Sequence, residues 1–139
     1  MQATCTEGSR RELEISASAE EWLAFADQLD AASGAIKFPG RPAKSPREFP
    51  LRSLLIRTED RPQVLISVDP AAIDASIAGR REHLEQFARM VRLFAQKSRR
   101  GQADPIENRG PGHFIDPASV LTLFHLGGED APREGDVGG

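Results

Sequence analysis

The sequence of 139 residues contains no tyrosine, one tryptophan and a single cysteine, Cys5. One cysteine excludes an internal disulfide and any zinc site that is built from several cysteines. No apolar run approaches the roughly 18 residues of a membrane-spanning helix, and the N-terminus lacks the apolar stretch of an ordinary secretory signal. We therefore expect a cytoplasmic protein that contacts no membrane.

Sequence motifs of catalysis are also missing. Ser119 does not lie in a Gly-x-Ser-x-Gly turn, and Gly110-x-Gly112 lacks the following helix and the lysine of a phosphate-binding loop. The apolar runs at 54–58 and 64–68 contain no aromatic residue that could stack on bases. We expect a protein that is not an enzyme, uses no cofactor and binds no nucleic acid.

The net charge of −3 is unevenly distributed along the chain. Residues 1–37 carry seven acids and three bases, residues 38–112 carry fourteen bases and nine acids, and residues 113–139 carry five acids and one base. Residues 1–10 show no periodicity, and residues 127–139 are acidic and rich in glycine, which is typical of unstructured chain. The sequence predicts a flexible leader at 1–10, one folded domain at 11–126 and a disordered tail at 127–139.

The folded part begins with a strand that runs directly into a helix. Residues 13–17 alternate apolar and polar side chains, which indicates a half-buried strand. Ser18 and Glu21 then form a capping box, in which a hydroxyl and a carboxylate satisfy free amides at a helix start. Trp22, Phe25, Ala26 and Leu29 follow at the spacing of a buried helix face.

A proline-rich connection at 38–50 separates this unit from the rest of the chain. The runs at 54–58 and 64–68 predict a hairpin, and Asp69-Pro70 predicts the start of a helix that continues to about Lys97. Residues 98–112 indicate a loop, and a last strand is expected at about 120–126. No internal repeat is apparent, although both halves show a strand that runs into a capped helix.

These elements predict a single α+β domain with two main helices on one face of an antiparallel sheet. The expected order is strand, helix, strand, strand, helix, strand, which is the order of ferredoxin-like folds.

Two groups of residues are candidates for function or for a specialised structure. Glu20, Asp27 and Asp30 share an outward face of the first helix and form a candidate docking surface for a basic partner protein. His113, Asp116, Pro117 and Ser119 indicate a structural turn, because an aspartate before proline bonds nearby backbone amides. The alternative for the second group is a metal site of His113, Asp116 and His125 in a small metal-dependent enzyme.

The end of the chain resembles a family of bacterial immunity proteins from polymorphic toxin systems, immunity protein 32. That family has a closing segment of the type His-Leu-Asp-Pro-x-Ser-Phe-Leu, and the matching residues here are His113, Phe114, Ile115, Asp116, Pro117, Ser119, Val120 and Leu121. The resemblance covers roughly residues 51–126, because the preceding hairpin and helix follow the same order. Phe114 separates the histidine from Ile115, which replaces leucine, and Val120 replaces phenylalanine.

The resemblance implies a small α+β protein that binds and neutralises a cognate bacterial toxin without catalysis. The same features also fit an accessory or adaptor domain of a larger assembly. The oligomeric state is open at this point.

Overall fold

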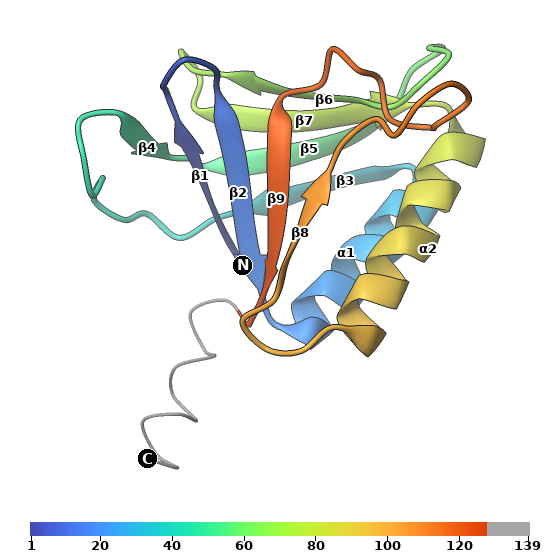
Figure 1. Ribbon diagram of the computed structural model, residues 1–139, viewed down its shortest axis with the longest axis horizontal. Coiled ribbons are helices and arrows are strands. Elements are labelled where there is room, and N and C mark those ends of the chain that lie inside the picture. The colour runs from blue at the N-terminus through green and yellow to red at the C-terminus, as the bar shows by residue number, and fades with distance from the viewer. Residues whose placement is uncertain (128–139) are drawn as a thin grey trace.

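The computed structural model describes residues 1–127, which form two helices and two sheets (Figure 1). The first sheet, sheet A, has the order β4-β1-β2-β9-β8, with β1 at Gln2–Thr6, β2 at Glu12–Ala17, β4 at Glu48–Pro50, β8 at Ala103–Ile106 and β9 at Leu121–Leu126. Sheet B has the order β3-β5-β7-β6, with β3 at Ser33–Lys37, β5 at Ser53–Thr58, β6 at Leu65–Asp69 and β7 at Asp74–Gly79. The helices are α1 at Ala19–Ala31 and α2 at Arg81–Lys97, and they pack against each other. The predicted α+β class with two main helices is confirmed.

The strands do not form the single antiparallel sheet that we expected from a ferredoxin-like order. Strands β5 and β6 both exist, but they are not a hairpin, because β7 lies between them. Strand β5 runs parallel to β7, and β6 pairs with β7 in the antiparallel direction. The predicted hairpin at 54–68 is therefore wrong in its pairing, although both of its strands are present.

The topology contains an internal repeat that we did not recognise in the sequence. Apart from the short strand β4, which is inserted between β3 and β5, the first half runs β1-β2-α1-β3-β5 and the second half runs β6-β7-α2-β8-β9. In the first half, β1 and β2 lie in sheet A and β3 and β5 lie in sheet B. In the second half the order is reversed, with β6 and β7 in sheet B and β8 and β9 in sheet A. As a result β9 pairs in parallel with β2, and β5 pairs in parallel with β7. The two halves are therefore interlocked and share one continuous core.

Helix α1 begins where the capping box predicts. The Ser18 hydroxyl accepts a hydrogen bond from the Glu21 amide at 3.2 Å, and the Glu21 carboxylate accepts one from the Ser18 amide at 3.0 Å. At the other end Ala32 adopts a left-handed conformation, with φ of 55°, and its amide bonds the last turn of the helix. The chain then continues directly into β3.

Helix α2 begins later than Asp69-Pro70 predicts. The Asp69 carboxylate does accept hydrogen bonds from the amides of Ala71 and Ala72, as at a helix start. However, Ile73 takes a left-handed φ of 49° and the chain returns as β7, so Asp69 caps only one turn. Gly79 is the last residue of β7 and packs closely against Val64. A Cβ atom at this position would lie 2.9 Å from Val64 Cγ2, so the close contact requires glycine.

Two further regions are more ordered than the sequence predicts. The proline-rich connection at 38–50 contains the short strand β4, which pairs with β1, and Phe38 at its start is buried. The expected loop at 98–112 contains β8, which pairs with β9. Both strands are short and contain proline, so their own residues carry little strand signal and the pairing is decided by the neighbouring strand.

The core is centred on an aromatic cluster around Phe124 of β9. Its ring lies 4.3 Å from Trp22 and 6.0 Å from Phe87 between centroids, stacked in both cases. Phe25 and Phe94 complete the cluster at 6.0 and 6.4 Å. The Trp22 indole N–H donates to the His125 carbonyl at 3.0 Å, so its one polar atom is satisfied inside the core.

The predicted leader at 1–10 is wrong, because Gln2–Thr6 forms β1 in the interior of sheet A, between β2 and β4. Ala3 and Cys5 point into the core and are buried. Small and polar side chains make this strand hard to recognise, although its partner β2 follows it directly in the sequence. The predicted tail lies, from residue 128 onward, outside the described residues.

We predict that Cys5 is unreactive in the folded protein. Burial raises the pKa of its thiol to about 11, while Arg11 lowers it and Glu7 raises it to smaller extents. Thiolate is the reactive form, so iodoacetamide at about pH 8 should label the protein only after urea is added. Labelling of the native protein at the rate of the unfolded chain would contradict this.

The same shift predicts a pH dependence of stability. The unfolded thiol loses its proton near pH 8.5, whereas the folded thiol keeps it up to about pH 11. The contribution of Cys5 is therefore complete below about pH 8.5 and is lost as the pH rises to about 11. Urea melts of Cys5→Ala should lack this part of the alkaline decline.

Candidate functional site

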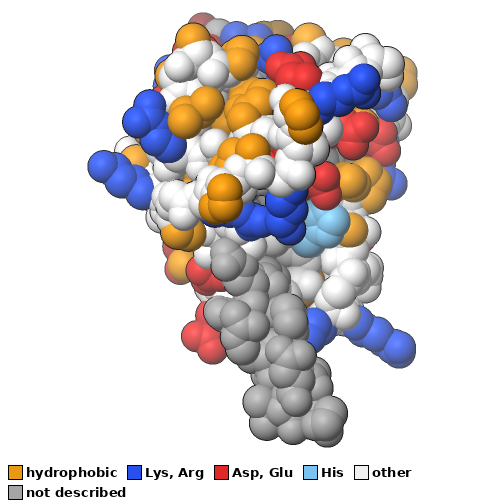
Figure 2. All heavy atoms as spheres, turned by 90° about the vertical axis from the view of Figure 1, so that its left-hand side faces the viewer, with side chains coloured by type: hydrophobic (Ala, Val, Ile, Leu, Met, Phe, Trp, Pro, Cys, Tyr) orange, Lys and Arg blue, Asp and Glu red, His pale blue; other side chains and the backbone are white. Residues whose placement is uncertain are grey.

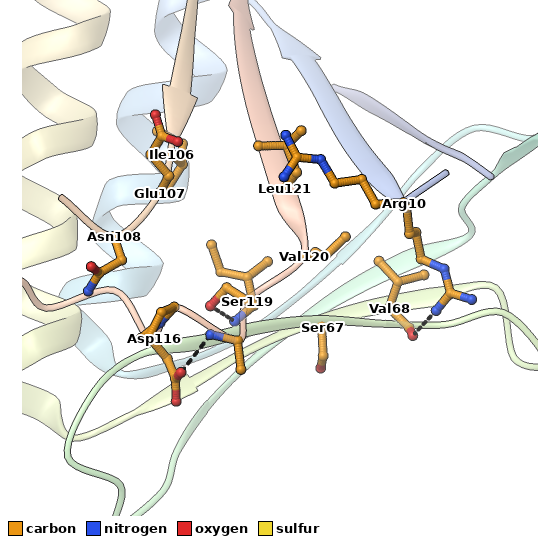
Figure 3. Close-up of a pocket in the computed structure, with 14 residues that line it drawn as sticks. Arg10, Ser67, Val68, Ile106, Glu107, Asn108, Asp116, Ser119, Val120 and Leu121 are labelled. Atoms are coloured by element: carbon orange, nitrogen blue, oxygen red, sulfur yellow. Dashed lines mark hydrogen bonds between the residues drawn. The ribbon is translucent and has the colours of Figure 1, made fainter. Parts of the chain in front are cut away.

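A polar cleft opens where the turn between β1 and β2 approaches β6. It has a volume of about 520 Å³ and is also lined by the residues just after β8 and just before β9. Figure 3 shows Arg10 on one side of the cleft and Glu107, Asn108 and Asp116 on the other. No aromatic side chain lines the cleft; its lining is Arg10, Arg11, Ile66, Ser67, Val68, Ile106, Glu107, Asn108, Asp116, Pro117, Ala118, Ser119, Val120 and Leu121.

The closing segment before β9 builds one side of the cleft and is held along the edge of sheet B. The Val64 amide donates to the Phe114 carbonyl at 2.7 Å, and the Val64 carbonyl accepts from the Asp116 amide at 2.8 Å. Farther along, the Ile66 amide donates to the Ser119 hydroxyl at 3.0 Å. These bonds pair the free edge of β6 and fix the position of the segment.

The turn that the sequence predicts at Asp116 is present. Its carboxylate accepts a hydrogen bond from the Ala118 amide at 2.8 Å, across Pro117. The same carboxylate lies 3.7 Å from the Arg61 guanidinium. Asp116, Pro117 and Ser119 thus shape the cleft wall, whereas His113 lines the apolar groove described below.

The two walls of the cleft carry opposite charges. On the basic side, Arg11 pairs with Glu7 at 2.8 Å and donates to the Val68 carbonyl at 3.4 Å, and the bond to Glu7 raises the pKa of its guanidinium. Its neighbour Arg10 is exposed and has no partner within residues 1–127. On the acidic side, Glu107 is likewise exposed without a partner in that part of the chain.

The sequence does not single out Arg10, Arg11 or Glu107, because Arg10 lies in the predicted leader, Arg11 immediately precedes the first predicted strand and Glu107 lies in the predicted loop. One signal was available. Residues 2–6 and 12–17 both alternate in polarity around Gly8-Ser9, which is the pattern of a hairpin. Recognising that hairpin would have placed the two arginines at its turn.

Two residues of the candidate acidic face on α1 form ion pairs with another residue of the same chain. The Arg92 guanidinium of α2 lies 2.8 Å from an Asp27 carboxylate oxygen and also contacts Asp30. These bonds, first to Asp27 and then to Asp30, raise the pKa of Arg92. Glu20 is exposed and has no partner among the described residues. A docking role for Glu20, Asp27 and Asp30 stays a prediction, on a face that Arg92 partly neutralises.

The alternative metal site of His113, Asp116 and His125 is not assembled in the described chain. His125 bonds Glu14 at 2.8 Å on the outer face of sheet A, whereas the His113 ring accepts a hydrogen bond from the Ile115 amide. Within residues 1–127 no three histidine, cysteine or carboxylate side chains are grouped as metal ligands. Neither α1 nor α2 has the length and apolarity of a membrane-crossing helix.

The side of the molecule that carries β4 and the connection before it has a mixed surface. Figure 2 shows cationic, anionic and apolar side chains interspersed on this face, without a continuous basic stripe. Its hollow, of about 250 Å³, is lined by both signs of charge, including Arg41, Lys44, Glu14 and Glu48. The Lys44 amide already donates to the Glu48 carboxylate at 3.1 Å.

An apolar groove of about 450 Å³ lies between α2 and β8. Leu93 on its rim is 52% exposed, more than any other large apolar side chain of the described chain. His113 stacks on Phe114 at 4.6 Å between ring centroids. Burial, and then the nearby Arg109, lower the pKa of His113, so its ring stays neutral at neutral pH.

No family model matches this sequence, and no curated protein or solved structure matches it either.

Proposed function

We propose that this protein binds a partner protein and neutralises it, as the immunity proteins that its closing segment resembles do. The observation that carries the proposal is the two-sided cleft, in which Arg10 and Glu107 present free charges of opposite sign from opposite walls. The partner would be a bacterial toxin, and inhibition would require no reaction on this chain.

The character of the cleft favours a protein loop as its occupant. Small-molecule pockets are lined mainly by apolar and aromatic side chains, whereas this cleft has no aromatic lining residue and several charged ones. A loop with one basic and one acidic side chain satisfies both walls at once. Such charge-assisted hydrogen bonds are about twice as strong as neutral ones and fix the orientation of the partner.

The location of the resembling segment supports the same proposal. Residues 113–121 carry the resemblance, and Asp116 to Leu121 line the cleft. Their backbone bonds to Val64 and Ile66 hold this wall on sheet B. A positioned wall lowers the entropy cost of binding, because little of it has to be ordered by the partner.

The test uses the product of the reading frame immediately upstream of this gene. Co-expression with this chain should restore growth that the upstream product alone arrests. Arg10→Glu and Glu107→Arg should each weaken binding by about tenfold or more, which is about 1.4 kcal/mol, because each reverses a charge that the partner complements. Binding is measured by titration calorimetry at two salt concentrations.

Arg99→Glu is the matched control, because Arg99 is an exposed arginine after α2 that does not line the cleft. It should leave the affinity unchanged. Growth arrest that this chain does not relieve would exclude neutralisation. Relief of arrest with wild-type affinity in both cleft variants would show that the cleft is not the binding site. Binding without relief would instead support the adaptor function.

A further inference from the structure

We propose that the apolar groove between α2 and β8 binds an acidic amphipathic helix of the partner protein. This inference rests on the proposed function, since it names a second surface and the chemistry of the segment that covers it. The segment would carry apolar side chains one helical turn apart, flanked by aspartate or glutamate.

The shape and lining of the groove define the apolar part of this ligand. Met90, Val91 and Phe94 of α2 form one wall, and Pro105, Ile106 and Phe114 form the other. Leu93 stands on the rim of the α2 wall and is more than half exposed. Burying a leucine of this exposure under a partner removes apolar surface from water, which stabilises the complex.

The edge strand beside the groove favours a helix over an added strand. Strand β8 is four residues long and contains Pro105, which has no amide hydrogen to donate. An extended peptide would therefore find an interrupted ladder at this edge. A helix satisfies its own backbone bonds and needs only the apolar groove.

The charges around the groove define the polar part of the ligand. Arg89 and Lys97 lie one turn before and one turn after Leu93 on α2, and Arg109 lines the opposite wall. All three are exposed and have no partner within residues 1–127. Asp104 also lines the groove and accepts a hydrogen bond from the uncharged Gln102 at 3.3 Å, so one negative charge stands against these three positive ones. The excess of unpaired cations complements an acidic segment and opposes a basic one.

The groove and the cleft adjoin each other, so that one partner can contact both. Ile106 lines both cavities, and the chain that follows it divides them. Glu107 and Asn108 line the cleft, whereas Arg109 lines the groove.

The test uses the purified chain and a synthetic peptide, without the toxin. The peptide is a fluorescein-labelled helix of roughly four turns, with leucines at i, i+4 and i+7 and glutamates elsewhere. Fluorescence anisotropy should show saturable binding that Leu93→Ser and Arg109→Glu each weaken by about tenfold or more. A peptide with lysine in place of glutamate should bind about tenfold more weakly.

Leu55→Ser is the matched control. Leu55 is the other exposed large apolar residue of the described chain, at 39%, and lies on sheet B away from the groove. It should leave peptide binding unchanged, and Leu93→Ser should keep the wild-type melting temperature because its side chain is exposed.

Three outcomes would overturn the inference: no saturable binding, equal binding of the acidic and basic peptides, or unaltered binding by Leu93→Ser. A loss of self-association in Leu93→Ser by sedimentation would assign the groove to a second copy of the chain instead. Because no toxin is present, these results are independent of the growth and cleft experiments. Relief of growth arrest without peptide binding would therefore contradict only the proposal for the groove and leave the proposed function in place.

Discussion

Replacement of Phe124 by alanine is expected to lower the free energy of unfolding by about 3–5 kcal/mol, because the change leaves a large cavity. Phe124 is 1% exposed and its ring contacts four others, from both helices. Its strand β9 belongs to the second half of the chain but pairs with β2 of the first half. The cavity therefore forms at the junction of the two interlocked halves, where neighbouring side chains have little freedom to collapse into it. Urea denaturation monitored by circular dichroism measures the change.

Leu123 provides the control for Phe124, because it is the preceding residue of β9 and faces outward. Leu123 is only partly buried on the outer face of sheet A. Its replacement by alanine should cost less than about 1 kcal/mol, since no enclosed cavity forms. Equal losses for the two variants would show that the aromatic cluster does not organise the core.

Removal of residues 1–7 is expected to abolish cooperative unfolding. Strand β1 makes five registered pairs with β2 and three with β4, so its loss exposes the edge of β2 and leaves β4 without its partner strand. It also uncovers the core beneath Ala3 and Cys5. The free energy of unfolding of a single domain is only about 5–15 kcal/mol, and the loss of an interior strand removes a large part of it. Differential scanning calorimetry would show a shallow transition or none.

A pair of point variants tests the same strand without shortening the chain. Ala3→Lys places a charge in the core and should cost more than about 3 kcal/mol. Thr4→Lys places the same side chain on the outer face, opposite Glu14, and should be close to neutral. A truncated protein that melts near the wild-type temperature, or similar effects of the two variants, would restore the assignment of this segment as a leader.

The elements that could be predicted from the sequence are those whose signal lies within a few neighbouring residues. The capping box at Ser18 and Glu21 and the stripe that begins at Trp22 depend only on contacts along one helix, and both are present. The turn at Asp116 is also local, because its carboxylate bonds an amide two residues away. The Asp69 turn was identified for the same reason, but a local signal could not tell one turn from a whole helix.

The repeat leaves a trace in the sequence. Trp22, Phe25, Ala26 and Leu29 of α1 have the same spacing as Leu84, Phe87, Ala88 and Val91 of α2, and both sets are buried. The strands on either side diverge in sequence, and the turns differ more, with Gly-Ser-Arg-Arg at residues 8–11 and Pro-Ala-Ala-Ile at residues 70–73. The difference at the turns matters for the proposed function, because the first turn supplies the arginines of the cleft.

The sequence by itself determined helix α1, the body of α2 but not its start, the strands β2, β5, β6 and β9, the closing turn and the α+β class. Each of these follows from side-chain periodicity or from a bond between near neighbours. Only the tertiary structure decided which strands pair, because β9 pairs with β2, β4 pairs with β1 and β5 pairs with β7, and in each pair other elements of the chain lie between the two strands. It also decided where the free charges meet: Arg10 and Glu107 are 97 positions apart in the chain, and the exchange of strands between the two halves brings them to one cleft.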